Sequence, residues 1–240
     1  MNLFSRVAIA FVVSIGAAWG CEEPREYDLS PRILPARRQV VSWVEDHYRG
    51  VETIRAAVLM TIDPIDPRAD PLVTAEYRGH IWVRRPGSFR IVVVGPSEWT
   101  AVSDGHAVLQ QIPPEFWMQS EAAVAPQFGV LSGTRSLARD FAFDEVTQGD
   151  VRDVVCVSGS WIEPARFDWH RFCVSTNVDD RGTIVMSEHV ERASGVRVLL
   201  EYSSVESNPL LDEELFVIAR PIDMVDISGA GDRASLATPF

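Results

Sequence analysis

Apolar and polar residues alternate over two long stretches of the sequence, and this period of two constrains the fold more than any other feature. The apolar positions of the first stretch are Ile54, Ala56, Val58, Met60 and Ile62. Those of the second stretch are Ala75, Tyr77, Gly79, Ile81 and Val83. Successive side chains of a β-strand point to opposite faces of its sheet, so both stretches are predicted strands with one apolar face.

Shorter apolar segments continue this pattern between residues typical of tight turns. Residues 89–94, 99–103 and 106–111 are separated by Gly95-Pro96 and Asp104-Gly105, and Arg85-Pro86-Gly87 precedes them. An Asp-Gly pair between apolar segments is a strong hairpin signal. Strands are predicted again from Val151 onward, with hairpins at 179–182 and 194–195 and a last short strand at 214–219. The simplest interpretation is a meandering antiparallel sheet.

Two segments lack the period of two. Residues 36–49 place Val40, Val41, Val44 and Tyr48 at helical spacing before Gly50, which predicts one amphipathic helix. Residues 115–140 follow a pair of prolines and are predicted to be a helical or irregular insert rich in large apolar side chains. A sheet with one apolar face needs a cover, and these two segments are long enough to provide it. The predicted fold class is therefore mainly β with helices (α+β).

The amino terminus has the features of a secretory signal. Arg6 precedes an apolar run from Val7 to Ile15, which is shorter than the roughly 18 to 20 residues that span a bilayer. Residues 1–20 are the predicted signal peptide, and Cys21 is the predicted lipidation site because a small residue precedes it. Cleavage by ordinary signal peptidase, which leaves an unused thiol, is the alternative. Residues 21–35 then form the lipidated cysteine and tether, 36–227 the folded domain and 228–240 a flexible tail.

The other two cysteines lie in β-rich segments on either side of a predicted turn. If Cys21 is lipidated, Cys156 and Cys173 remain as an even pair, and an exported protein meets oxidising conditions. A hairpin turning near Pro164 sets the two opposite each other, which predicts a cross-strand disulfide. Two inert buried thiols are the alternative.

Charge and motifs exclude several classes of protein. The formal net charge is −12, which opposes binding to nucleic acid phosphates and to anionic membrane surfaces. The five histidines are dispersed in sequence, and neither a Gly-x-Ser-x-Gly turn nor a glycine-rich phosphate loop is present. We therefore predict no enzyme, no cofactor and no metal site. The acidic pair Asp179-Asp180 is interpreted as part of a turn.

Two sequence segments suggest a family. The segment GHIWVRRPGSFRIVVVGPSEWTAVSDG (Gly79–Gly105) resembles the LolA and LolB outer-membrane lipoprotein carriers and receptors, with a strand, an Arg-Pro-Gly-x-Phe-Arg turn, a second strand and a Ser-Asp-Gly hairpin. The segment NPLLDEELFVIARP (Asn208–Pro221) resembles the closing element of that family. The resemblance covers most of residues 36–227. In that family an arginine holds the cover closed. Arg55 and Arg78 lie on early predicted strands, but neither stands in a motif that matches the family, so no residue of this chain is assigned that role.

The resemblance implies an unclosed antiparallel β-barrel covered by helices, with an apolar cavity for acyl chains. The residues predicted to line that cavity are Ile81, Val83, Phe89, Ile91, Phe116, Trp117, Met118 and Phe128. Each of them would also be apolar in an ordinary packed core.

Two functions follow as predictions. The first is a lipid-anchored, monomeric envelope protein, on the periplasmic side, that binds acyl lipids or acylated proteins and takes part in their transport to the outer membrane. The alternative is an interaction or sensing module that uses the same fold to bind a partner protein without lipid transfer.

Overall fold

The computed structural model describes residues 34–64, 74–112, 116–121, 128–162, 169–191, 195–217 and 225–226. For residues 112, 116–121 and 225–226 it describes the backbone alone. The predicted signal peptide, Cys21 and the tail at 228–240 lie outside the described residues. The predictions for these segments therefore stay predictions.

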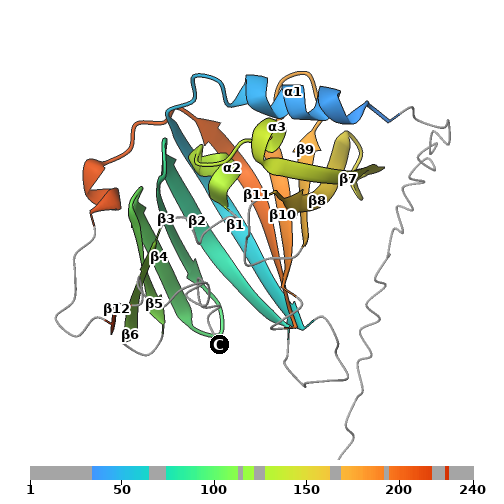
Figure 1. The fold of residues 1–240 in the computed structure, drawn as a ribbon. Coiled ribbons are helices and arrows are strands. Elements are labelled where there is room, and N and C mark those ends of the chain that lie inside the picture. The colour runs from blue at the N-terminus through green and yellow to red at the C-terminus, as the bar shows by residue number, and fades with distance from the viewer. Residues whose placement is uncertain are drawn as a thin grey trace, which may run out of the picture. The chain divides into compact units, whose positions relative to one another are not determined.

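The described chain forms one sheet with a few short helices (Figure 1). The strands are β1 (Thr53–Pro64), β2 (Ala75–Arg84), β3 (Ser88–Val94), β4 (Glu98–Asp104), β5 (Ala107–Ile112), β6 (Phe116–Glu121), β7 (Phe141–Gln148), β8 (Val154–Trp161), β9 (Trp169–Ser175), β10 (Ile184–Glu191), β11 (Val196–Ser207) and β12 (Val225–Asp226). The helices are α1 (Arg37–His47), α2 (Gly129–Ser132), α3 (Leu137–Asp140) and the 3₁₀ helix η3 (Glu213–Phe216).

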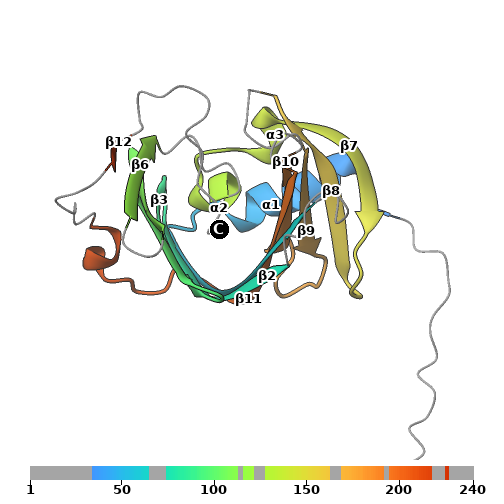
Figure 2. The same cartoon turned by 90° about the horizontal axis from the view of Figure 1, so that it is seen from below.

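The strand order is β12-β6-β5-β4-β3-β2-β1-β11-β10-β9-β8-β7. Strands β1 to β6 form one meander and β7 to β11 form another, and the pairing of β1 with β11 joins them. All these pairings are antiparallel, while β12 adds a short parallel pairing to β6. Strands β12 and β7 lie at opposite edges, so the sheet is not closed. Figure 2 shows the sheet curved into a trough with α1 and α2 on its inner side, which confirms the predicted half-barrel.

The inner face of the trough is the apolar face that the sequence predicted. In β1 the residues Ala56, Val58 and Met60 are at most 4% exposed, and they belong to one core with residues of α1 and α2. Arg55, which directly precedes Ala56, points outward and forms an ion pair with Glu206 of β11. The alternation of side chains along each strand thus places the core between the concave side of the sheet and the helices.

Helix α1 lies close to its predicted bounds of 36–49. Val40, Val41 and Val44 are buried against the sheet, and Gly50 has a φ of +77° just beyond the helix end. A positive φ costs glycine little, so the chain turns here into β1. The predicted turns at 85–87, 95–96 and 104–105 also join consecutive strands of the first meander.

The prediction of a helical or irregular insert at 115–140 is wrong in its first part. Residues Phe116–Glu121 form strand β6, which pairs with β5 in register from Ile112↔Phe116 to Ala107↔Glu121. Without β6, the backbone hydrogen-bonding groups along one side of β5 would have no strand partner. Pairing with β5 therefore determines this strand, although its own sequence lacks the period of two. The helical part of the insert consists of α2 and α3.

The prediction of a strand at 214–219 is also wrong. Residues Glu213–Phe216 form the 3₁₀ helix η3, and the Asp212 side chain accepts a hydrogen bond of 3.0 Å from the backbone N–H of Glu214. An aspartate that caps a turn in this way favours helical backbone over a strand. Phe216 is buried, and its ring lies 4.7 Å from the guanidinium carbon of Arg84. The segment therefore packs against the sheet without joining it.

Candidate functional site

Four of the predicted cavity residues lie side by side on the concave face. Ile81 and Val83 of β2 stand directly opposite Ile91 and Phe89 of β3 in the antiparallel register. Their side chains are at most 2% exposed. They form an apolar patch beneath the helices.

Phe128 meets this patch from the other side. It directly precedes α2, is 1% exposed, and its ring centroid lies 5.0 Å from that of Phe89 at an interplanar angle of 42°. Val130 and Leu131 of α2 are buried beside it. The structure therefore brings together five of the eight predicted residues, on β2, on β3 and at the start of α2.

Phe116, Trp117 and Met118 were predicted to belong to the cover, and this placement is wrong. They lie on β6, which is separated from β3 by β4 and β5. Their side chains lie outside the described residues. Any contribution of theirs to a ligand site would therefore come from the sheet.

Helix α1 is attached to the second meander by polar contacts at its carboxyl end. The backbone N–H of Ile184 donates a hydrogen bond of 3.1 Å to the Tyr48 hydroxyl, and His47 Nε2 lies 3.1 Å from Thr183 Oγ1. Burial raises the pKa of the Tyr48 hydroxyl to about 12, so the hydroxyl stays protonated. Gly182 passes so close to the helix that a Cβ at this position would lie 2.1 Å from the carbonyl oxygen of Trp43. These contacts fix α1 relative to the turn between β9 and β10.

Helix α2 is attached to the first meander instead. The backbone N–H of Gly87, in the turn between β2 and β3, donates to the carbonyl of Ser132 at 2.8 Å. Gly133 caps the helix with a φ of +74° and lies against the guanidinium of Arg85 from the same turn. The two helices that cover the concave face are thus held by different halves of the sheet.

Arg85 connects the two helices. Its Nη1 donates a hydrogen bond to the backbone carbonyl of Tyr48, and its guanidinium carbon lies 5.7 Å from the Tyr48 ring centroid. Burial lowers the pKa of the Arg85 guanidinium, although the arginine remains charged at neutral pH. Arg85 was not predicted from the sequence as a contact to the cover. Its place in the Arg-Pro-Gly turn was the available signal, while Arg55 and Arg78 pair with Glu206 and Glu76 instead.

Helix α3 is tied to α1 through Glu45. The Glu45 carboxylate accepts hydrogen bonds from Ser136 Oγ at 2.7 Å and from the backbone N–H of Ala138 at 3.4 Å. The Ser136 side chain in turn caps α3 by accepting from the N–H of Arg139. A carboxylate at the first turn of a helix is favourably placed for the helix dipole. Helices α1 and α3 therefore form one part of the cover, and α2 forms the other.

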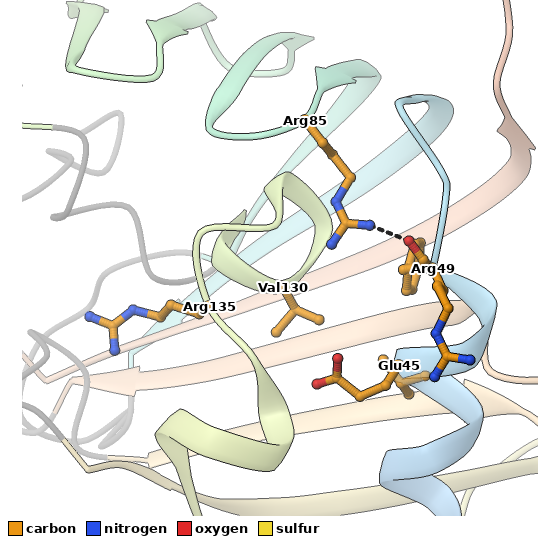
Figure 3. A pocket seen from close by; sticks show the side chains of 7 residues that line it. Glu45, Arg49, Arg85, Val130 and Arg135 are labelled. Atoms are coloured by element: carbon orange, nitrogen blue, oxygen red, sulfur yellow. Dashed lines mark hydrogen bonds between the residues drawn. The ribbon is translucent and has the colours of Figure 1, made fainter.

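A cleft of about 220 Å³ opens between α1 and α2 (Figure 3). Its lining residues are Val44, Glu45, Tyr48, Arg49, Arg85, Val130 and Arg135. Val44, Tyr48 and Val130 are also members of the buried core, so the cleft reaches from solvent to the outer surface of that core. Charged side chains surround this apolar floor.

A second hollow of about 600 Å³ lies on the opposite face of the sheet. Its lining includes Leu59 of β1 and Met186 of β10, which alternate with the core residues of their strands, and Val151, which is 67% exposed. The disulfide between Cys156 and Cys173 lines the same hollow. These cysteines face each other in the register of β8 and β9, which confirms the predicted cross-strand disulfide.

The structure brings together two histidines that are distant in sequence. His170 and His189 lie on neighbouring strands with their Nδ1 atoms 2.8 Å apart, and both side chains are 0% exposed. The rings of Phe141, Trp161 and Phe172 surround the pair. Burial, together with the neighbouring His170, lowers the pKa of His189 well below its usual value. His189 is therefore neutral near pH 7.

Among the described residues, no three His, Cys, Asp or Glu side chains are grouped closely enough to hold a metal ion. The helices in this part of the chain are too short or too polar to cross a bilayer.

Comparisons with known proteins identify similar structures but no similar sequences. No family model matches the chain, and no curated protein matches it. A LolA superfamily protein from Nitrosomonas europaea is 10% identical, with a TM-score of 0.42 over 77% of this chain and 99% of its own. A putative outer membrane lipoprotein-sorting protein domain from Vibrio parahaemolyticus is 8% identical, with a TM-score of 0.44 over 74% and 94%.

The lipoprotein LppX from Mycobacterium tuberculosis is a third similar structure, 11% identical, with a TM-score of 0.37 over 74% of this chain and 99% of its own. The family that the sequence resembles is thus represented among the similar solved structures. The likeness is coarse at these TM-scores.

Proposed function

We propose that this chain is an envelope protein that binds acyl chains between the concave face of its sheet and the helices α1 and α2. The observation that carries the proposal is the construction of the cover. Two separate helices, held by different halves of an open sheet, enclose a continuous apolar face, and a cleft between them reaches the core. A shift of one helix relative to the other would expose apolar surface, which the acyl chain of a ligand would then cover.

The energy available from such a ligand is large enough for binding. Each buried methylene contributes about 0.8 kcal/mol, so ten methylenes contribute about 8 kcal/mol before the costs of association and of displacing Phe128 are subtracted. Helix α2 spans a single turn of four residues, so its position depends on its contacts with the rest of the protein. The contacts that a displaced Phe128 loses with Phe89 are replaced by contacts with the acyl chain.

The ligand-contacting residues that we propose are those of the concave patch and its cover. Ile81, Val83, Phe89 and Ile91 line the sheet side, and Phe128 lines the helix side. Because successive side chains of a strand point to opposite faces, either Trp117 alone or Phe116 together with Met118 would extend this surface along β6. The client is an acyl lipid or an acylated protein, and a role in its transport to the outer membrane belongs to the same proposal.

The test of acyl binding is native mass spectrometry of the full chain purified with Cys21→Ser, so that no covalent lipid is present. The expected spectrum contains a population heavier by the mass of an acyl lipid, which excess fatty-acyl probe displaces. Phe128→Ala should weaken probe binding, and Leu59→Ala on the outer face of β1 serves as the matched control. Protein that is always empty and takes up no probe would overturn the proposal.

Anchoring to the membrane is proposed at Cys21, and the predicted signal at 1–20 would deliver the chain to the envelope. A diacylglycerol on this thiol would hold the monomeric domain at the periplasmic surface by residues 22–35. Cells expressing the chain should incorporate labelled palmitate into it, and Cys21→Ser should abolish the label. A wild-type chain without label would contradict lipidation.

A second function, binding of a partner protein without lipid transfer, is favoured by one observation. The hollow of about 600 Å³ on the outer face combines exposed apolar side chains with charged ones, as protein interfaces do. If the chain binds no acyl probe, this face is where a partner would be sought. Photo-crosslinking from Val151 in cells would then identify it.

A further inference from the structure

The cleft between α1 and α2 carries an excess of positive charge. Its lining contains Arg49, Arg85 and Arg135 but only one acidic residue, Glu45, which makes three positive charges and one negative. The whole chain has a formal net charge of −12, so this excess runs against its average. The three arginines come from just beyond the end of α1, from the turn between β2 and β3 and from the segment between α2 and α3.

From this arrangement we propose that the cleft binds the anionic headgroup of the acyl ligand, a phosphate or a carboxylate, with the chain directed toward the core. The inference rests on the proposed acyl-binding function and specifies the class of ligand. Recognition of the headgroup would select anionic amphiphiles over neutral ones of the same chain length.

Arg85 is the central residue of the site. One guanidinium nitrogen donates to the Tyr48 carbonyl, and the remainder of the planar group lies at the cleft beside Gly133. The side chain is half-buried, so part of the water that would solvate its charge is absent. A bound anion would replace that water with charge-assisted hydrogen bonds, which are stronger than those between neutral groups.

Arg49 supplies the second charge. It lies four residues after Glu45, just beyond the end of α1, and lines the same cleft as Arg85; in Figure 3 its side chain extends on the Glu45 side of that cleft. Its ion pair with Asp46 spans 2.6 Å between side chains that are 77% and 54% exposed, and pairs of this kind are weak. Arg49 can therefore turn toward an anion at little cost.

The remaining charged side chains do not cancel this field. The Glu45 carboxylate offsets one of the three positive charges, and its hydrogen bonds from Ser136 and from the N–H of Ala138 hold it on the α3 side of the cleft. Arg135 points away from the other two arginines in Figure 3, and its guanidinium carbon lies 4.8 Å from the Trp161 ring centroid. We therefore assign direct contact with the anion to Arg85 and Arg49, with Arg135 adding positive potential at longer range.

The size of the cleft fits a headgroup better than a complete lipid. Its volume of about 220 Å³ is below the roughly 300 to 1,000 Å³ of typical small-molecule sites. Val44 and Val130 form an apolar floor that continues into the core. A headgroup and its first methylenes would fill the cleft, and the rest of the chain would lie between the helices and the sheet.

The experiment compares dodecyl phosphate with dodecanol, which has the same chain and no charge, by calorimetric titration of the full-length Cys21→Ser protein. Hydrogen bonds to a charged group predict that dodecyl phosphate binds at least about ten-fold more tightly. Arg85→Gln should reduce this preference, measured as the ratio of the two affinities so that any change in the cover affects both amphiphiles alike, to about three-fold or less. Arg49→Gln, at a more exposed position, should reduce it about two-fold, and Arg78→Gln on the outer face is the control.

The outcomes separate this inference from the proposed function. Equal affinity for the two amphiphiles, or a preference that survives both Arg85→Gln and Arg49→Gln, would overturn the headgroup site and leave acyl binding intact. Binding of neither amphiphile would overturn both. Inorganic phosphate alone is the third ligand, and affinity equal to that of dodecyl phosphate would overturn the assignment to an amphiphile. If Arg85→Gln does not fold, the about two-fold reduction expected for Arg49→Gln tests the site by itself, and an unchanged preference in that variant would overturn it.

Discussion

Among single residues, the two histidines buried in the core, His170 and His189, are the most informative. His170 and His189 share a hydrogen bond between their Nδ1 atoms, which requires one ring to donate and the other to accept. Two protonated rings cannot form this bond. Because His189 is fully buried beside His170, folding lowers its pKa well below the usual value, whereas the unfolded chain protonates histidine near pH 6.5.

This difference predicts a loss of stability in mild acid. A base whose pKa is lowered by folding stabilises the protein fully above its unfolded pKa and progressively less as the pH falls toward the folded value. The free energy of unfolding, measured by urea denaturation, should therefore decrease from pH 7.5 to pH 5. His189→Gln should flatten this slope, and the remainder should come from His47, whose pKa burial also lowers. An unchanged slope in His189→Gln would contradict the account.

At the scale of elements, attachment of the cover depends on close contacts that single residues permit. Gly182 has a φ of +89° and carries no Cβ, which lets the turn between β9 and β10 touch the backbone of α1 at Trp43. Helix α1 also reaches the core through Tyr48 and its hydrogen bond to Ile184. The position of α1 over the trough is therefore set by one turn of the second meander.

Gly182→Ala should displace α1 without unfolding the sheet. The added Cβ would lie 2.1 Å from the Trp43 carbonyl at a backbone angle that alanine disfavours, so we expect a cost of about 1–3 kcal/mol. Hydrogen exchange should rise in residues 37–47 and change little in β1 and β2. Gly195→Ala is the matched control, because Gly195 also has a positive φ but no atom lies within 4 Å of its Cβ position. Equal effects of the two variants would show that only the strained φ matters.

The sequence predicted the elements whose evidence is local. The alternation of residues 75–83 and the turn at 85–87 identified β2, β3 and the apolar patch of Ile81, Val83, Phe89 and Ile91. Strand β6 was missed because its pairing with β5 decides its conformation. Arg85 was missed as a link to α1 because its contact with Tyr48 joins residues 37 positions apart, and no local pattern records that proximity.

At the scale of the whole domain, residues 34–217 combine an open sheet with a divided cover. The two meanders meet only at β1 and β11 within the described chain, and each half carries its own helix. Flexing at this junction would widen the space under the helices without breaking a strand pairing. We therefore predict that the acyl ligand enters between α1 and α2 and contacts β2 and β3.

Binding of the acyl chain between the helices and strands β2 and β3 is best tested by photo-labelling with a fatty acid that carries a diazirine in its alkyl chain. After irradiation and digestion, mass spectrometry should locate the label in peptides containing residues 81–91 and 128–131. Unlabelled fatty acid in excess should suppress it. Label confined to the outer face, such as peptides of 149–154 and 185–186, would contradict binding under the cover, and so would the absence of label.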